Sequence, residues 1–434
     1  MAAAADQSEE KKELRLEEIL EQNGHSVGWL VETLKNNEPK FAVLCSSGEI
    51  KEYGVRKIGE GKGYCSHVFR VSFRFDGDAG AADYSLVLKI PTIDQWVAAH
   101  KGLGRTIDEA KLKRFERTIR ETHEAECDVL EFLHDLHATG FPIPAVYAME
   151  RRTDEQPGIF LMQDASINAH SPDIYDSMSA ELCENFVRHI ADFQTFVELK
   201  PAELWQDRFS KSHYVERFKK DSKTDMPGVS AVFTIPNEKN EVMDQYALLD
   251  MYEFSKFTII DCSEAIGAST LNHSDAWTNN LLVKENSPNE ISAFLDWAIM
   301  SKCNPLFDIA CFIGWCAEAE VRRAHEERLL DVFHERLTEN LRAHGRKPRF
   351  SREQATELYE LAFVHVVCTF IEIFTFQALP LLQQEENAED KKKAEHLLQR
   401  LRAALEDAGR LLKKHEIVER FGRKKTEEGE KPAE

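Results

Sequence analysis

Residues 271–297 read LNHSDAWTNNLLVKENSPNEISAFLDW, and this stretch decides the fold that we expect for the rest of the chain. His273 and Asp275 stand two positions apart, and Asn280 follows five positions after the aspartate. A second aspartate, Asp296, closes the stretch next to a tryptophan. The pattern is therefore an HxDxxxxN loop with a further acidic residue downstream.

Two short apolar runs lie between Asp275 and Asp296. LLV at 281–283 and ISAFL at 291–295 are separated by ENSPNE, which is rich in turn-forming residues. Apolar runs on either side of such a turn are typical of a β-hairpin. A hairpin would fold the chain back on itself, so we expect Asp296 to lie close to Asp275 and Asn280.

These residue types suit the transfer of a phosphoryl group from ATP. The reaction requires a carboxylate near the attacking hydroxyl, and it requires oxygen ligands for the magnesium ions on the phosphates. Asp275 would act on the hydroxyl, while Asn280 and Asp296 would bind Mg²⁺. A single Asp or Asn in a polar loop is more often a simple turn former, but the ordered set favours catalysis.

The stretch resembles the catalytic loop of the kinase-like phosphotransferases that include aminoglycoside phosphotransferases and choline kinases. It is most similar to the CHK or ecdysteroid kinase-like (DUF1679-type) family of small-molecule kinases, whose loop usually reads HGDxWxxN with IDW further on. Ser274 replaces the usual glycine and Leu295 precedes Asp296, but neither change removes a group that would contact metal or phosphate. We expect Ser274 to keep ordinary backbone angles, with its hydroxyl turned away from the metals. The matching positions are His273, Asp275, Trp277, Asn280, Asp296 and Trp297.

The resemblance implies a two-lobe α+β fold like that of protein kinases and aminoglycoside phosphotransferases. The first lobe would carry a small antiparallel sheet, and the second would be mostly helical. ATP and Mg²⁺ would bind between the lobes, with Asp275 and His273 in the catalytic loop. We place the first lobe at residues 13–163, the second at 164–420, and disordered tails at 1–12 and 421–434.

Runs of β-branched and aromatic residues, broken by glycine and aspartate, precede a long charged segment. Such runs predict an antiparallel sheet. An amphipathic helix is predicted ahead of them, around residues 13–22. The predicted strands are residues 41–47, 52–58, 67–75 and 84–90.

Glycines recur between the second and third predicted strands. Gly59, Gly61 and Gly63 occupy alternate positions before Ser66 in IGEGKGYCSHVF. Glycines let backbone N–H groups approach a phosphate, although a plain hairpin turn uses the same residues. The resemblance identifies this segment as the phosphate-binding loop. It also identifies Lys89, at the end of the fourth strand, as the lysine that contacts the α- and β-phosphates of ATP.

A long charged helix is predicted over residues 107–137. In the related kinases a glutamate on such a helix forms an ion pair with the strand lysine. Glu126 is our candidate because it precedes an apolar stripe around Leu130 that would pack on the sheet. Glu121 and Glu124 are the alternatives.

The strand predicted at 159–165 leads into the hinge between the lobes, where the resemblance places adenine binding. Gln163 and Asp164 stand where the family commonly carries an acidic pair. Adenine recognition there uses main-chain groups, so the glutamine is compatible with binding.

Most of the remaining chain reads as helix. The polar segment 200–245 has no clear period, and the family uses this part for acceptor binding. Asp308 would open a core helix and have a structural role. The predicted helices are residues 179–199, 317–344, 351–378 and 388–417.

The composition limits the partners and the compartment. The 434 residues include 55 basic and 76 acidic ones, for a formal net charge of −21, which disfavours a broad surface for nucleic acid or anionic membrane. The N-terminus has no apolar signal core, and the nine cysteines contain no CxxC pair, so we expect a cytoplasmic protein with reduced thiols.

The longest apolar run, residues 361–376, contains His365 and Glu372. It is shorter than the roughly 20 residues that a membrane helix needs, so it predicts a buried helix. His365 and Cys368 lie three positions apart and could be read as metal ligands, but without a second pair we interpret them as core residues.

Three functions are compatible with these features. The first is an ATP- and Mg²⁺-dependent kinase acting on a small alcohol, by resemblance a steroid, a choline-like amine or a xenobiotic metabolite. The second is a catalytically silent pseudokinase that binds nucleotide or protein, which Ser274 and Gln163 would favour. A protein kinase is disfavoured because DFG and APE motifs are missing from their expected places.

Overall fold

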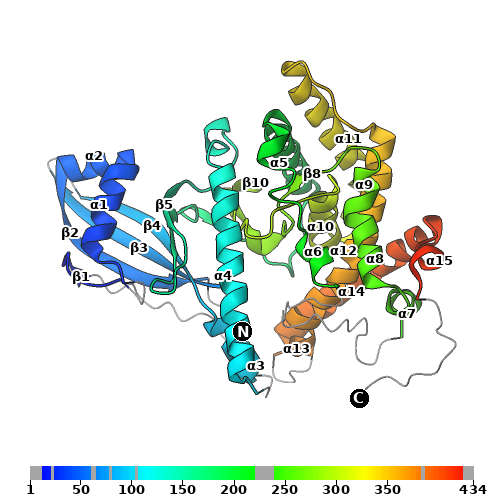
Figure 1. Cartoon of the computed structure of the whole chain (residues 1–434), viewed down its shortest axis with the longest axis horizontal. Coiled ribbons are helices and arrows are strands. Elements are labelled where there is room, and N and C mark those ends of the chain that lie inside the picture. The colour runs from blue at the N-terminus through cyan, green and yellow to red at the C-terminus, as the bar shows by residue number, and fades with distance from the viewer. Residues whose placement is uncertain are drawn as a thin grey trace. The chain divides into compact units, whose positions relative to one another are not determined.

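The computed structural model describes residues 12–20, 24–59, 65–77, 81–102, 106–219, 239–382 and 387–423. These residues form two compact units (Figure 1). The first unit comprises the chain up to His170 together with residues 282–286 and 292–299, and the second comprises the remainder. An antiparallel sheet dominates the first unit and helices dominate the second, which confirms the α+β fold class.

The first unit contains strands β1 (Lys12–Glu13), β2 (Gly48–Ile58), β3 (Ser66–Gly77), β4 (Ala82–Pro91), β5 (Val146–Glu150) and β6 (Ile159–Gln163). They form one sheet in the order β1-β2-β3-β4-β6-β5, in which neighbouring strands are antiparallel. Its helices are α1 (Val27–Asn37), α2 (Pro39–Ser47), α3 (Asp94–Gly102), α4 (Glu109–Phe132) and the short η1 (His137–Thr139).

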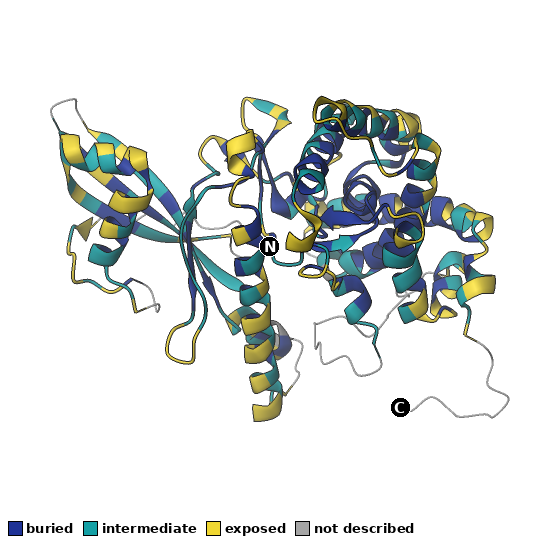
Figure 2. Ribbon diagram, turned by 45° about the horizontal axis from the view of Figure 1, so that its top comes forward, coloured by how far each residue is buried: buried dark blue, intermediate teal, exposed yellow. Residues whose placement is uncertain are grey.

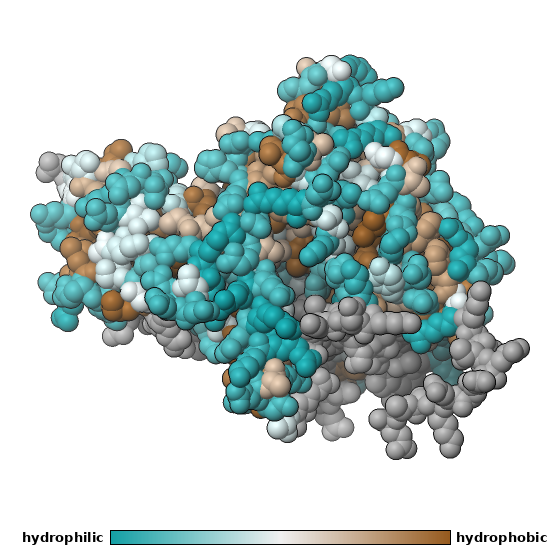
Figure 3. Space-filling view, in the orientation of Figure 1, coloured by the Kyte–Doolittle hydropathy of each residue, from teal (hydrophilic) through white to brown (hydrophobic). Residues whose placement is uncertain are grey.

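Helices α1, α2 and α4 pack against the sheet of the first unit. Buried residues of α1 and α2 share a core with β2, β3 and β4. On α4, Cys127 and Leu130 pack against Phe160 of β6, as the apolar stripe of the predicted helix required. The side of α4 that faces the viewer in Figure 3 is mostly hydrophilic, in keeping with its many charged residues.

Residues 41–47 form α2, so the predicted strand was wrong. Pro39 stands in the first turn of α2, where its fixed backbone angle suits a helix. The Glu38 side chain caps the same turn by accepting a hydrogen bond from the Lys40 amide at 3.2 Å. Phe41 then anchors the helix, with its ring edge-on to Phe73, Phe75 and Tyr84. These N-terminal signals outweigh the strand propensity of the segment.

The helix predicted around residues 13–22 was also wrong. Lys12 and Glu13 pair with the edge of β2 as strand β1, and residues 14–20 are not helical. Leu16 and Ile19, which an amphipathic helix would bury, are 50% and 59% exposed. Backbone pairing with an open sheet edge thus replaces the intrahelical hydrogen bonds.

The second unit contains helices α5 (Ala180–Leu199), α6 (His213–Glu216), α7 (Glu241–Ala247), α8 (Met251–Lys256), α9 (Cys262–Glu264), α10 (Phe307–Cys316), α11 (Ala319–Ala343), α12 (Arg352–Gln377), α13 (Leu379–Leu382), α14 (Ala388–Lys414) and α15 (Ile417–Phe421). Shorter turns are η2 (Ala202–Leu204), η3 (Phe257–Asp261) and η4 (Thr278–Asn280). Strands β8 (Thr270–Asn272) and β11 (Ser301–Cys303) pair antiparallel. The long helices predicted for this part of the chain are confirmed within a few residues of their ends.

The core of the second unit is formed by α10 and α12. Every residue of α10 is buried, and α10 packs against α12 while α11 packs against α5. The Phe186 and Phe312 rings stack at 4.1 Å, and the Trp315 indole donates a hydrogen bond to the Val366 carbonyl at 2.8 Å. Buried residues gather on the inner faces of these helices (Figure 2).

The predicted hairpin is present. It consists of β9 (Leu281–Lys284) and β10 (Ser287–Phe294), which form a three-stranded sheet in the order β10-β9-β7 with β7 (Ala169–His170). Ala169 pairs with Lys284, and His170 pairs with Val283. The turn-rich segment between the apolar runs was therefore a sufficient signal.

The apolar stretch around residue 365 lies within α12. Among the described residues, one helical segment, Arg352–Thr375, is long and apolar enough to cross a membrane, but 78% of its apolar window is buried inside the protein, and core helices pass the same test. His365 is fully buried among the Tyr214, Phe254 and Phe307 rings. This supports its interpretation as a core residue.

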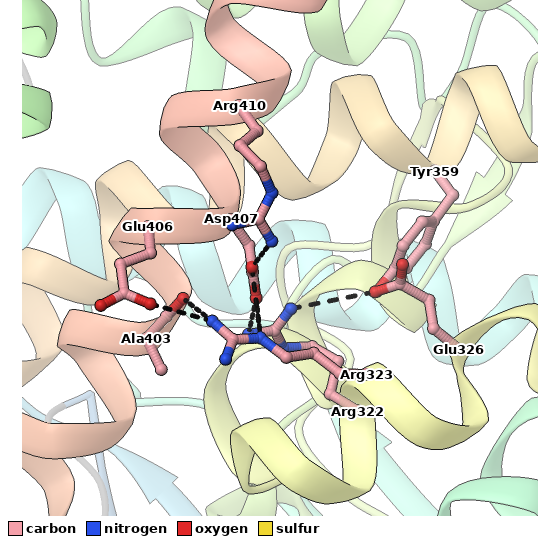
Figure 4. A network of polar contacts seen from close by, with 8 residues as sticks. All are labelled: Arg322, Arg323, Glu326, Tyr359, Ala403, Glu406, Asp407 and Arg410. Carbon is pink, nitrogen blue, oxygen red and sulfur yellow. Dashed lines mark hydrogen bonds and ion pairs between the residues drawn. The ribbon is translucent and has the colours of Figure 1, made fainter.

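A charged network joins α11 to α14 in the second unit (Figure 4). Asp407 of α14 is buried and accepts from Arg322 at 2.5 Å and from Arg323 at 3.0 Å, and it also pairs with Arg410. Burial opposes ionisation of Asp407, but Arg323 and Arg322 outweigh it and hold the pKa of this carboxyl below its usual range. Asp407 is thus the common partner of three guanidinium groups.

We expect Asp407→Asn to lower the free energy of unfolding at pH 7 by about 3–5 kcal/mol, because it leaves buried guanidinium charge without its carboxylate. Since the folded-state pKa is lowered, this contribution is present above the unfolded pKa near 4 and is lost as the pH falls through the folded value. Urea unfolding measures both effects. The control is Glu406→Gln on the exposed rim of the network, where we expect less than about 1 kcal/mol. Equal small losses in the two variants would contradict this assignment.

Candidate active site

Lys89 of β4 lies between two carboxylates that come from distant parts of the first unit. Its ammonium nitrogen is 2.6 Å and 2.9 Å from the two carboxylate oxygens of Glu126 on α4. The same nitrogen is 3.3 Å from an oxygen of Asp296. The side chains of Lys89 and Glu126 are nearly buried, whereas that of Asp296 is 46% exposed.

The structure selects Glu126 from the three candidates on this helix. Glu124 instead pairs with Arg151 at 2.7 Å, and Glu121 lies on the exposed side, 3.8 Å from Arg117. Only Glu126 stands on the face of α4 that packs on β6, beside Cys127 and Leu130. The helical period therefore decides which acid reaches the lysine.

The electrostatics of this group favour a charged lysine. Burial opposes the ammonium form of Lys89, but the charges of Asp296 and Glu126 outweigh it and raise the pKa of Lys89. Burial raises the pKa of Glu126, and the Lys89 charge acts against that rise. A cation fixed in this way is suited to contact phosphate oxygens.

Asp296 and Asn280 have the donor chemistry that Mg²⁺ prefers, which is hard oxygen. The Asp296 carboxylate is accessible, and its backbone is in the left-handed region, with φ of +58°. Within the described ranges, no cluster of three or more His, Cys, Asp or Glu side chains could hold a metal ion by itself. Mg²⁺ is usually held by one or two carboxylates plus substrate phosphates, so the chemistry of the Asp296 carboxylate by itself fits an ion that arrives with a nucleotide.

The predicted glycine loop is only partly within the described residues. Gly59 follows β2 with φ of +69°, a conformation that favours glycine, and Ser66 begins β3 opposite Pro91. Gly61 and Gly63 lie outside the described residues. The role of this segment in binding phosphate remains a prediction.

Asp164 follows β6 and is held by protein groups. Its carboxylate accepts from Ser85 at 2.7 Å and from Ser166 at 2.5 Å, and it pairs with Arg70 at 2.8 Å. Burial acts against ionisation, yet the Ser166 and Ser85 hydrogen bonds and the Arg70 charge hold the pKa of Asp164 below its usual range. The Gln163 side-chain oxygen accepts from the Ala145 amide at 3.2 Å. Asp164 therefore orders the segment after β6, and Gln163 ties the end of β6 to Ala145, just ahead of β5.

Sequence reasoning missed Arg70 as the partner of Asp164. Arg70 lies on β3 and pairs across the sheet with Val87 of β4, two residues from Lys89. Side chains of a strand alternate between faces, so Val68 and Arg70 share the face on which Lys89 stands. β3 carries two arginines, Arg70 and Arg74, and the sequence alone does not show which of them meets Asp164.

In the second unit, the loop after β8 is held by Asp308 at the start of α10. The Asp308 carboxylate accepts from the His273 amide at 2.7 Å and from the Ser274 amide at 2.8 Å. Burial raises the pKa of Asp308 to about 7, while the hydrogen bonds from Ser274 and His273 favour its ionised form. The structural role that we predicted for Asp308 is to fix the backbone of this loop.

Asp275 and Asn280 contact each other directly. The Asn280 amide nitrogen donates to the Asp275 carboxylate at 2.7 Å and to the Asp275 carbonyl at 2.9 Å. The Asp275 amide in turn donates to the His273 ring at 3.3 Å. These bonds use the nitrogen of Asn280, and its oxygen is the atom that a metal would require. The loop thus presents the Asp275 carboxylate in a fixed orientation.

Ser274 has φ of +67°, so our expectation of ordinary backbone angles was wrong. The family glycine suits this left-handed conformation, which costs a serine about 1 kcal/mol. The Ser274 hydroxyl lies 3.3 Å from the Asn272 carbonyl and 3.0 Å from the Ser301 hydroxyl. The Ser301 hydroxyl is a partner that we could not foresee, because β11 meets β8 only through tertiary pairing. These two hydrogen bonds offset the backbone strain.

We expect Ser274→Gly to change the free energy of unfolding by no more than about 1 kcal/mol, because relief of strain and loss of the two hydrogen bonds oppose each other. For any acceptor found, the rate should change by less than about tenfold. Urea unfolding and turnover measure the two effects, with Ser301→Ala as the control that removes one hydrogen bond without relieving strain. An inert wild type beside an active glycine variant would show instead that the serine disables the site.

Comparison with known proteins places the chain in a family. A family model, DUF1679, described as "Uncharacterized oxidoreductase dhs-27", matches residues 48–416. The chain belongs to the DUF1679 family. A Caenorhabditis elegans member, itself described as "Uncharacterized oxidoreductase dhs-27", is 21% identical over 358 residues, which are 79% of this chain and 41% of that protein. This DUF1679 chain thus spans less than half the length of its curated relative.

Solved structures similar to this DUF1679 protein include phosphotransferases. A putative aminoglycoside phosphotransferase from Ralstonia eutropha has a TM-score of 0.45 at 14% identity and covers 89% of this chain and 98% of its own. A microcompartment-associated aminopropanol kinase has a TM-score of 0.43 at 12% identity, and the match covers 90% of this chain and 98% of the kinase. A Streptomyces rimosus aminoglycoside phosphotransferase in complex with ADP and streptomycin has a TM-score of 0.33 at 14% identity. The match covers 72% of this chain and 92% of that protein.

Proposed function

We propose that this protein is a cytoplasmic, ATP- and Mg²⁺-dependent kinase that phosphorylates a hydroxyl group of a small molecule. The acceptor class is a steroid, a choline-like amine or a xenobiotic alcohol. The observation that carries the proposal is the position of Lys89 between a buried acid, Glu126, and an accessible acid, Asp296. Glu126 holds the lysine in place, while the exposed carboxylate of Asp296 can exchange the lysine for a metal ion.

Each residue has one role in this proposal. Lys89 contacts phosphate oxygens, and Asp296 and the Asn280 oxygen bind Mg²⁺. The metal ion supplies positive charge that stabilises the phosphate oxygens as they react. Asp308 fixes the loop that carries Asp275.

Asp275 acts on the acceptor as a general base. The acceptor oxygen forms a bond to the γ-phosphorus, the bond from that phosphorus to the bridging oxygen breaks, and ADP leaves. The Asp275 carboxylate accepts the hydroxyl proton. Asn280 orients this carboxylate through the 2.7 Å hydrogen bond. No residue of the chain is covalently modified during this reaction.

A nucleotide- or protein-binding pseudokinase is the alternative. The strained serine at position 274, where the related kinases carry glycine, favours it. Under this alternative Mg-ATP still binds, but no acceptor gains phosphate.

A screen of metabolite extract tests the proposed function. Wild-type protein with Mg-ATP should produce a metabolite whose mass increases by one phosphate, and Asp275→Asn should not. A matched control, Asp244→Asn, changes an exposed aspartate of α7 and should retain the activity. Products that form equally with wild type and Asp275→Asn would rule out the proposed role of Asp275.

A further inference from the structure

The helix that runs from α8 to α9 is interrupted by η3, which is a π-helical turn over Phe257–Asp261. Turns of this kind are rare and often mark functional sites. The Thr258 and Ile259 carbonyls of this turn accept hydrogen bonds from Asn304, a fully buried residue that follows β11. The Asn304 side-chain nitrogen lies 3.2 Å from the Thr258 oxygen, and its backbone nitrogen lies 2.7 Å from the Ile259 oxygen.

Every polar atom of Asn304 is hydrogen-bonded. Besides its contact with the π-helical turn, the side-chain nitrogen donates to the Leu358 carbonyl of α12 at 2.8 Å. The side-chain oxygen accepts from the Leu306 amide at 3.0 Å, and the backbone carbonyl accepts from the Asn272 side chain at 3.1 Å. Asparagine supplies two donors and one acceptor, whereas an ionised aspartate has no donor and a serine has only one. The partners of Asn304 therefore call for an amide side chain.

One link from Asn304 leads to the start of α10. Its side-chain oxygen and its backbone carbonyl accept from the Leu306 and Phe307 amides, and these bonds form the turn that opens the helix. Asp308 is the next residue, and its carboxylate holds the loop that carries Asp275. The position of Asp308 therefore depends on the turn that Asn304 forms.

A second link leads to the end of β8. Asn272 is the last residue of β8, directly before His273, and it is as fully buried as Asn304. Its side-chain nitrogen donates to the Asn304 carbonyl. The Gln194 side chain of α5 donates to the Pro305 carbonyl at 2.6 Å, so a further helix fixes the same segment. Asn304 thus joins both supports of the loop to the π-helical turn and to α12.

We propose that Asn304 is a positioning residue for phosphate transfer, which holds Asp275 in place through Asp308 and Asn272. This role rests on the proposed kinase function, whereas the tether from Asn304 to the loop does not. Asn304 acts on the rate only through the loop. Misplacement of a catalytic group by about 1 Å can lower a rate by about 10²-fold, so a small shift of the loop is measurable.

Asn304→Asp tests the proposal, because it keeps the size of the side chain and removes both hydrogen bonds that the side chain donates. The measurement is the slow hydrolysis of Mg-ATP, with water in place of the acceptor, well below the melting temperature of each variant. We expect kcat to fall by about 10–10²-fold and the KM for Mg-ATP to stay within about threefold of wild type, since Lys89 and Asp296 lie outside the loop. An asparagine with a purely structural role would lower the melting temperature and leave kcat of the folded protein unchanged.

Amide hydrogen exchange of residues 271–280, followed by mass spectrometry, measures the tether without any activity. Exchange in this segment should be faster in Asn304→Asp than in wild type. Asn272→Ala removes the second link alone and should show both effects to a smaller degree. It also provides the test if Asn304→Asp does not fold. The matched control is Asn185→Asp, because Asn185 of α5 likewise donates to a carbonyl, that of Asn289 at 2.6 Å, and this variant should behave as wild type.

Unchanged kcat in Asn304→Asp and Asn272→Ala would overturn the proposal, as would unchanged exchange of residues 271–280. An equal loss of kcat in Asn185→Asp would also overturn it. A wild type that hydrolyses no ATP and transfers no phosphate would instead contradict the proposed function. The exchange measurement would then decide by itself whether Asn304 holds the loop.

Discussion

Asp275→Asn is expected to lower the rate of phosphate transfer by about 10²–10⁴-fold, the usual contribution of a general base. The asparagine has the shape of the aspartate and keeps an oxygen that can accept the hydrogen bond from Asn280, but it cannot accept the hydroxyl proton. The loop should remain folded because Asp308 holds its backbone at His273 and Ser274. Affinity for Mg-ATP should therefore stay within about twofold of wild type.

Single-turnover kinetics and calorimetric titration with Mg-ATP separate these two quantities. Asp244→Asn is the matched control and should leave both unchanged. A loss of nucleotide affinity as large as the loss of rate would assign Asp275 to the metal instead of the acceptor. Asp296→Asn provides the contrast, because it should weaken Mg-dependent binding of ATP.

Lys89→Met is expected to lower the free energy of unfolding by about 3–5 kcal/mol, since it leaves the buried Glu126 carboxylate without its partner. The pKa of Glu126 is already raised by burial, and loss of the Lys89 charge raises it further. A folded-state pKa above the unfolded one gives stability that is present at low pH and lost as the pH rises through the folded value. The variant should therefore be more destabilised at pH 8 than at pH 5.

Urea unfolding at both pH values measures this effect. Adding Glu126→Gln to Lys89→Met should recover part of the lost stability, because the unpaired buried charge is removed. Lys51→Met is the matched control on the surface of β2, where Lys51 pairs with Glu49, and should cost less than about 1 kcal/mol. Additive losses in the double variant with no pH dependence would contradict a buried ionised Glu126.

The sequence was sufficient where the signal is local. The turn-rich segment between two apolar runs predicted β9 and β10, and the apolar stripe around Leu130 made Glu126 the candidate partner of Lys89, although only the structure excluded Glu121 and Glu124. Asp308 was predicted to be structural, and the structure shows it bonded to the His273 and Ser274 amides. These features depend on spacing within one element or on a short motif.

The sequence was insufficient where distant segments meet. Arg70 and Ser85 reach Asp164 from two strands, and Ser301 reaches Ser274 from β11. No local sequence pattern predicts these contacts. The left-handed backbone of Ser274 follows from the turn that Asp308 stabilises. In α2, the cap at Glu38 and the packing of Phe41 outweigh the strand propensity of the segment.

Thermal unfolding with and without Mg-ATP tests the central claim most directly, namely that Lys89 and Asp296 serve a nucleotide. A ligand that binds only the folded state stabilises it by RT ln(1 + [L]/Kd), which is about 2.7 kcal/mol at a hundred times Kd. Wild type should therefore melt at a clearly higher temperature with Mg-ATP, and Asp296→Asn should lose most of that increase. An unchanged melting temperature of wild type with every nucleotide and divalent metal would contradict the account.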